Sequence, residues 1–139
     1  MRYLGIDLGE VRIGVAMSDS MGMLASAYEV YKTVNKDVDL LHFIDLIKQN
    51  NVGCVVIGLP INMNGTEGPK AKYSREFKEL LETKLQELGI NCKVALQDER
   101  LTTVASEKIL IQTGVSREKR KTVIDKVEAA IILQTYLDT

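Results

Sequence analysis

The sequence of 139 residues predicts an α/β fold, with a mixed five-stranded sheet flanked by helices. Three observations support this prediction: three strand-like runs near the N-terminus, an alternation of helix and strand patterns in the middle, and a final helical pattern. The length fits a single domain, residues 1–139. Because 45% of the residues are hydrophobic, such a domain can bury a substantial core.

The first three strands are predicted over residues 2–8, 12–19 and 27–33. Between Arg12 and Asp19 apolar and small or polar residues alternate, which is typical of a strand that returns antiparallel in a hairpin. These three runs therefore predict an antiparallel part of the sheet.

The rest of the chain predicts helices that alternate with strands. A helix over 37–50 places Leu40, Ile44 and Ile47 on one face. The nearly continuous apolar run Val52 to Ile57 is typical of a parallel strand that is covered on both faces. The remaining predicted elements are a helix over 70–88, a strand over 92–98, and helices near 102–113 and 122–137.

The composition excludes several classes of protein. No apolar stretch approaches the length of a membrane span and no secretory signal precedes the first strand, so we expect a cytoplasmic protein with no membrane partner. Cys54 and Cys92 are isolated in the sequence, which makes a zinc site improbable. His42, the single histidine, falls in a helical pattern, and histidine-based catalysis is disfavoured.

Charge is distributed unevenly along the chain. The formal net charge is −1, which argues against nonspecific coating of nucleic acid. Residues 100–126 nevertheless hold seven Lys or Arg against three Asp or Glu, or +4, which leaves −5 for the remainder. A basic segment of this kind is suited to contacts with phosphates.

Asp7 is the first candidate functional residue, because it ends the apolar run from Leu4 and precedes a glycine turn. Gly9 and Gly14 permit backbone conformations that allow close approach to a phosphate. A single carboxylate does not hold a metal alone. The other acids that the fold can bring to Asp7 are Asp98, Glu99 and Asp125. Such carboxylates are the ligands that Mg²⁺ and Mn²⁺ prefer.

A long loop, residues 58–69, follows the predicted parallel strand. It is rich in Gly, Asn and Pro, and long loops at the carboxyl ends of strands often bind ligands. We therefore expect Asn64 and Gly65 to contact nucleic acid. The alternative is two consecutive turns without a binding role.

Four motifs, in this order along the whole chain, resemble the YqgF (RuvX) family. They are Asp7-Leu8-Gly9 with Gly14-Val15-Ala16, Gly58-x-Pro60-x4-Gly65-x2-Gly68, Asp98-Glu99-Arg100-Leu101-Thr102-Thr103, and Asp125-x3-Ala129-Ala130. The resemblance implies a ribonuclease-H-like fold and a magnesium-dependent nuclease. Members of this family are described both as nucleases that mature the 5′ end of precursor 16S rRNA and as Holliday junction resolvases. It also implies an active site of Asp7, one acid of the Asp98–Glu99 pair, and Asp125.

Asp98 and Glu99 are adjacent, so on a strand their side chains point to opposite faces. The alternation alone does not decide which of them is the metal ligand, and the family pattern favours Glu99. Arg100 either contacts a phosphate or pairs with the carboxylate that is not used for metal.

Asp125 has a structural alternative. The sequence Thr122-Val123-Ile124-Asp125 has the form of a capping box, in which Asp125 would bond to the start of its own helix. However, Asp125, Ala129, Ile132 and Tyr136 form one stripe of that helix, which favours a face turned towards the sheet. An acid at the head of a buried stripe needs a partner, and a metal ion is one.

A basic run precedes the last predicted helix. It contains Arg117, Lys119, Arg120 and Lys121, which are expected to bind phosphates that flank the acidic site. A solvated loop is the alternative. The few aromatic residues form no stacking cluster, so base-specific recognition is not expected.

These residues lead to one main hypothesis, a nuclease that holds two Mg²⁺ or Mn²⁺ ions and cleaves phosphodiester bonds in structured nucleic acid. Processing of the 5′ end of precursor 16S rRNA is favoured as its reaction over resolution of branched DNA. A resolvase should be a symmetric dimer, whereas RNA trimming needs only a monomer, and the oligomeric state stays open. A noncatalytic nucleic-acid-binding module and an actin-like nucleotide binder are the weaker alternatives.

Overall fold

The computed structural model describes residues 1–100 and 117–139, and it describes side chains for 1–100 and 127–139. Its strands are β1 (Arg2–Leu8), β2 (Arg12–Ser18), β3 (Ala25–Lys32), β4 (Val52–Leu59) and β5 (Lys93–Asp98). Its helices are α1 (Lys36–Asn50), α2 (Pro69–Glu87) and α4 (Arg117–Leu137). Among the described residues, no helix is both long and apolar enough to cross a bilayer.

The five strands form one sheet in the order β3-β2-β1-β4-β5. The β1–β2 and β2–β3 pairs are antiparallel, whereas β4 is parallel to both β1 and β5. The prediction of a mixed five-stranded sheet is therefore confirmed. Because β1, β4 and β5 run in the same direction, their carboxyl ends meet at one edge of the sheet.

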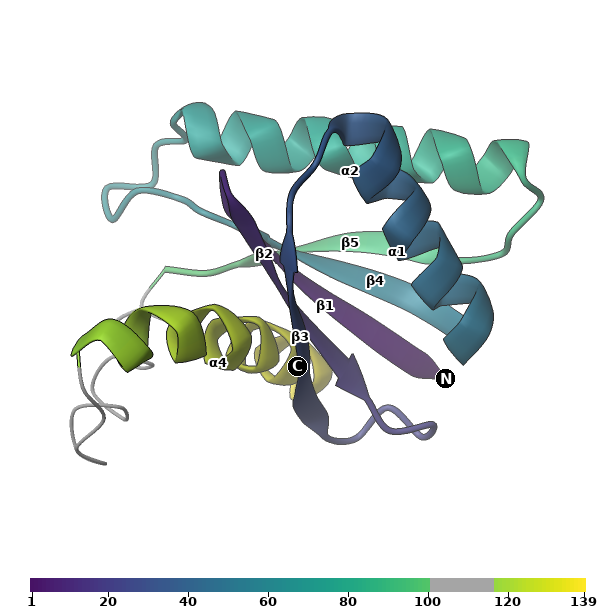
Figure 1. Cartoon of the computed structure of the whole chain (residues 1–139), viewed down its shortest axis with the longest axis horizontal. Helices are drawn as coiled ribbons and strands as arrows, with labels where there is room; N and C mark the ends of the chain where they lie inside the picture. Colours follow the sequence, from purple (N-terminus) through teal and green to yellow (C-terminus); the bar gives the residue numbers. More distant parts are fainter. Residues whose placement is uncertain (101–116) are drawn as a thin grey trace.

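Helices cover both faces of the sheet (Figure 1). Helices α1 and α2 cover one face, and the core between these helices and the sheet contains large side chains such as Leu4, Ile6, Phe43 and Leu81. Helix α4 crosses the other face, where it packs on β1, β2 and β3. The core beneath α4 is smaller and consists of Ala16, Cys54, Val56, Ala129, Ile132 and Leu133.

The start of helix α4 differs from the sequence prediction. The helix begins at Arg117 rather than near residue 122, so the basic run lies within its first turns and not in a loop before it. The capping-box form of residues 122–125 favoured the later start. The capping-box interpretation of Asp125 is wrong, because residues 122–125 lie inside the helix. The helix predicted near 102–113 lies outside the described residues.

Candidate active site

Three carboxylates converge where β1 and β5 end. Asp7, Glu99 and Glu128 each contribute one oxygen, and these oxygens all lie within 4.8 Å of one another. Asp7 is on β1, Glu99 directly follows β5, and Glu128 is on α4. Three segments that are distant in the sequence thus build one acidic cluster, which we call the acid cluster.

The alternation of side chains along the strands explains which acids meet. On β1, Leu4 and Ile6 face α1 and α2, so Asp7 points to the opposite face, which α4 covers. On β5, Ala95 packs beneath α4, and Glu99 has the same parity as Ala95. The amide of Glu99 still donates to the carbonyl of Leu59 (3.2 Å), which continues the strand pairing by one residue.

Glycine provides the space that Glu99 occupies. A Cβ atom at Gly58 would overlap the Glu99 carboxylate and would lie 2.8 Å from Cδ1 of Ile132. Gly5 plays a similar role below α4, since a Cβ atom there would lie 2.8 Å from Cβ of Leu133. The two glycines therefore let α4 and the Glu99 side chain lie directly against the sheet.

Burial and like charge act together on Glu99. Burial is the largest effect on this carboxyl, the charges of Glu128 and Asp98 add to it, and Lys70 partly opposes them. Together they raise the pKa of Glu99 to about 7. A carboxylate held in this way beside other acids favours either a proton or a cation, and a divalent ion fits an all-oxygen set of ligands.

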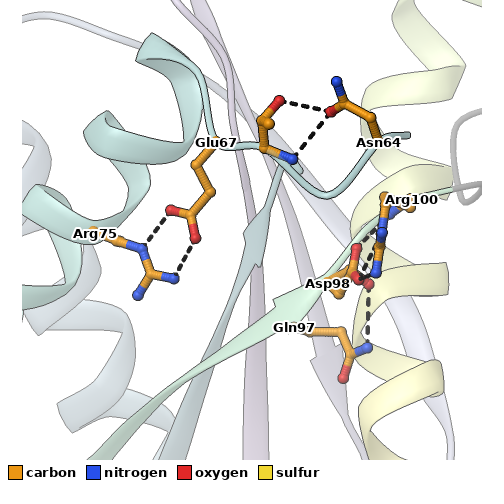
Figure 2. Close-up of polar contacts among 7 residues, drawn as sticks. Asn64, Glu67, Arg75, Gln97, Asp98 and Arg100 are labelled. Atoms are coloured by element: carbon orange, nitrogen blue, oxygen red, sulfur yellow. Dashed lines mark hydrogen bonds and ion pairs between the residues drawn. The ribbon is translucent and has the colours of Figure 1, made fainter. Parts of the chain in front are cut away.

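Asp98 is held by Arg100 (Figure 2). The backbone amide of Arg100 donates to Oδ1 of Asp98 (2.9 Å), and its guanidinium donates to Oδ2 (2.9 Å from Nε). These bonds from Arg100 lower the pKa of Asp98. Arg100 thus pairs with the carboxylate that is not part of the acid cluster, and a phosphate contact by Arg100 stays a prediction.

The loop after β4 is held by its own hydrogen bonds. The amide and the hydroxyl of Thr66 both donate to Oδ1 of Asn64 (3.1 and 2.6 Å), and the amide of Asn62 donates to the carbonyl of Thr66 (2.8 Å). Gly65 takes a positive φ of 88° at the tip. The loop is therefore a small exposed hairpin (Figure 2). The expected contacts of Asn64 and Gly65 with nucleic acid stay predictions.

The sequence analysis missed Glu128. This residue is only 7% exposed and follows Asp125 by three positions, about one helical turn. Two signals pointed to it: an acid flanked by Val127 and Ala129, and a spacing from Asp125 that places both acids on one side of a helix. The predicted stripe below them is confirmed for Ala129 and Ile132, which are fully buried against the sheet.

Some predicted site residues fall outside the described side chains. They are Asp125, Arg117, Lys119, Arg120 and Lys121. Their backbone belongs to α4, so Asp125 lies on the same helix as Glu128. Their expected roles in metal and phosphate binding stay predictions.

Comparison with known proteins now decides the family. The family model described as "RuvX: Holliday junction resolvase" matches residues 1–139. The chain belongs to the RuvX family. A relative from Bacillus subtilis (strain 168) is 49% identical over 142 residues, which cover 100% of this chain and 99% of the relative. A relative from Heliobacterium modesticaldum (strain ATCC 51547 / Ice1) is 47% identical over 138 residues, with coverage of 99% and 89%. Both carry the name "Putative pre-16S rRNA nuclease".

Solved structures with the same fold extend the comparison. RuvC of T. thermophilus, solved in complex with a Holliday junction substrate, has a TM-score of 0.60 and 14% identity, with coverage of 100% of this chain and 97% of that one. The Holliday junction resolvase of fowlpox virus also has a TM-score of 0.60, with 15% identity and coverage of 99% and 98%. This RuvX chain therefore has the ribonuclease-H-like fold of the RuvC-like resolvases, as the sequence motifs implied.

Proposed function

We propose that this protein is a metal-dependent nuclease that hydrolyses phosphodiester bonds in structured RNA. The acid cluster of Asp7, Glu99 and Glu128 is the observation on which the proposal depends. The three side chains come from three elements, and the like charges raise the pKa of Glu99, an effect that a bound cation would offset. Membership of the RuvX family supports the same reaction class.

The residues of the cluster fit a divalent cation. All three are carboxylates, the hard oxygen ligands of Mg²⁺ and Mn²⁺, and the absence of a side chain at Gly58 leaves room for Glu99 beside them. We assign Asp7, Glu99 and Glu128 as ligands, and Asp125 joins them through the family motif. A metal held by these residues would lower the pKa of a water for attack and would stabilise the leaving 3′ oxygen. Products with a 5′ phosphate and a 3′ hydroxyl follow from this arrangement.

Precursor 16S rRNA is the proposed substrate, cleaved at its 5′ end. The relatives that match the full chain at 44–49% identity carry the name of a nuclease for this RNA. The description of the family instead names Holliday junctions. Resolution of a junction is the second candidate, and it requires two copies of this chain so that two strands can be cut.

One experiment separates these substrates. The wild-type protein and Asp7→Asn are incubated with Mg²⁺ or Mn²⁺ and either a labelled 5′ leader of precursor 16S rRNA or a labelled four-way DNA junction. We expect the wild type to cut the RNA, and both EDTA and Asp7→Asn to abolish cutting. Circular dichroism spectra of the two proteins should coincide, because only one carboxyl oxygen changes. Cleavage of the junction alone would reassign the substrate, and a fully active Asp7→Asn would overturn the mechanism.

A further inference from the structure

A cavity of about 400 Å³ lies beside Leu8, the residue that follows Asp7 of the acid cluster. Residues from the β1–β2 turn and from the first turns of α2 line it. They are Leu8, Gly9, Glu10, Pro69, Lys70 and Tyr73. Leu8 directly follows Asp7, and its side chain packs towards α1 and α2, whereas Asp7 faces α4. A strand of nucleic acid that passes over the end of β1 would therefore meet the acids and then the cavity.

The walls of the cavity differ in chemistry. Leu8, Pro69 and the ring of Tyr73 offer apolar surface, and Tyr73 is half-buried. A flat aromatic base can pack on such a wall, because stacking on tyrosine needs no particular base. The volume is in the range of pockets that hold small ligands, so a single nucleotide fits better than a duplex.

Lys70 provides positive charge beside the acids. Its ammonium lies near enough to Glu99 to oppose the rise in the pKa of that carboxyl. Lys70 is the second residue of α2, and Gly68 at the N-cap has no side chain to cap this helix end. The amides of the first turn add partial positive charge at the same place. A phosphate between the acid cluster and the cavity would be attracted by both.

Glu10 is the one acidic residue in this lining. Its side chain is exposed, and a carboxylate accepts hydrogen bonds from donors such as hydroxyl groups. The ribose 2′-hydroxyl is such a donor, and it is the group that distinguishes RNA from DNA. Deoxyribose lacks it.

From this lining we propose that the cavity binds the ribonucleotide next to the scissile phosphate. The ring of Tyr73 stacks on the base, Lys70 binds the phosphate, and Glu10 accepts a hydrogen bond from the 2′-hydroxyl. The inference rests on the proposed nuclease function and assigns RNA as the substrate at this subsite. In this proposal Glu10, which lies outside the acid cluster, is responsible for the preference for RNA over DNA.

Binding to an uncut substrate tests the subsite. The probes are a fluorescein-labelled single-stranded oligoribonucleotide and the oligodeoxyribonucleotide of matching sequence, measured by fluorescence anisotropy on an Asp7→Asn background. Tyr73→Ala should weaken RNA binding about tenfold, and Tyr73→Phe should keep wild-type affinity because the ring is retained. Lys70→Ala should weaken binding to both probes. Glu10→Ala should lower the preference for RNA over DNA several-fold.

Lys48→Ala is the matched control for loss of one cation. Lys48 is exposed in the last turn of α1, which precedes the amino end of β4, so it lies far from the carboxyl ends of the strands. The subsite would be overturned if the Tyr73→Ala, Lys70→Ala and Glu10→Ala proteins bound the probes as tightly as the Lys48→Ala protein does. The cleavage assay separates the two proposals. If the wild type does not cleave but the variants lose affinity as expected, only the nuclease function is contradicted. If the wild type cleaves but the variants lose no affinity, only the subsite is contradicted.

Discussion

Glu99 and Asp98 illustrate how environment divides the roles of two adjacent acids. Asp98 accepts hydrogen bonds from the guanidinium and the amide of Arg100, and its pKa is lowered. Glu99 is buried near Glu128, and its pKa is raised to about 7. Hydrogen bonds favour the charged form of Asp98, whereas burial and the nearby acids disfavour the charged form of Glu99, which a bound cation would offset. This difference favours Glu99 over Asp98 as the metal ligand.

In the absence of metal, Glu99 should destabilise the folded protein at neutral pH. A carboxyl with a raised pKa costs stability as the pH rises from its ordinary value of 4.5 through about 7. The full cost is about 3 kcal/mol. We therefore expect Glu99→Gln to unfold at a higher temperature than the wild type at pH 8 in EDTA, and the gap to close towards pH 4.5. Thermal unfolding followed by circular dichroism measures both.

Asp98→Asn serves as the control with the opposite sign. Because the pKa of Asp98 is lowered, its contribution to stability is present above its ordinary value of 3.8 and is lost as the pH falls through the lowered pKa. Asp98→Asn should therefore be no more stable than the wild type at pH 8. Mn²⁺ should raise the unfolding temperature of the wild type and of Asp98→Asn more than that of Glu99→Gln. A wild type as stable as Glu99→Gln at pH 8 in EDTA would contradict the charge argument.

At the scale of elements, the contact between α4 and the sheet builds the site. Ala129, Ile132 and Leu133 are fully buried, and they seat the helix over β1 and β2. Gln134 fixes α4 further, since its side-chain Oε1 accepts a hydrogen bond from the backbone amide of Ala25 (2.8 Å) on β3. The position of Glu128 follows from this packing. The acid cluster thus depends on the docking of one helix as much as on the strands.

Two glycine substitutions should separate the effects on the site from the effects on the fold. In Gly58→Ala the new methyl group displaces the ends of the flexible Glu99 and Ile132 side chains, so cleavage should fall at least tenfold with little loss of stability. In Gly5→Ala it meets Cβ of Leu133 and the carbonyl of Ala129 (3.2 Å), and α4 has to shift. Overpacking of this kind costs about 1–3 kcal/mol. Urea unfolding and the RNA cleavage assay measure the two quantities, and an unaltered cleavage rate in Gly58→Ala would contradict the assigned position of Glu99.

At the scale of the molecule, charge is segregated along the chain. The +4 of residues 100–126 contrasts with −5 elsewhere, and the basic part includes the first turns of α4, the helix that carries Glu128. A polyanion that approaches three acids needs compensating cations nearby. This arrangement supports the predicted phosphate contacts of the basic run.

Salt dependence tests the basic run. Replacement of Arg117, Lys119, Arg120 and Lys121 by Ala should weaken RNA binding and reduce its dependence on salt. If all four contact phosphates, the slope of log K against log salt concentration should become shallower by about 3 for single-stranded RNA. Anisotropy titrations at salt concentrations from about 50 to about 200 mM measure this slope. An unchanged slope would leave the run as a solvated surface.

Much of this protein follows from local sequence patterns. The periods of apolar residues predict the strands and helices, because each element buries one face or both. The order of four motifs resembles the RuvX family, and this resemblance implies the ribonuclease-H-like fold and selects Asp7 and the Asp98–Glu99 pair as candidates. The predicted stripe of α4 holds for Ala129 and Ile132, because helical periodicity is a local property.

The tertiary structure decided what local patterns leave open. Strand alternation separates Asp98 from Glu99, but only the packing of α4 on one face of the sheet shows which of them shares a face with Asp7. Glu128 enters the acid cluster for the same reason, since its role depends on where its helix docks. The start of α4 at Arg117 was also missed, because the capping-box form of residues 122–125 indicated a later start. The sequence thus determined the elements and most of the candidate acids, and long-range packing determined which carboxylates meet.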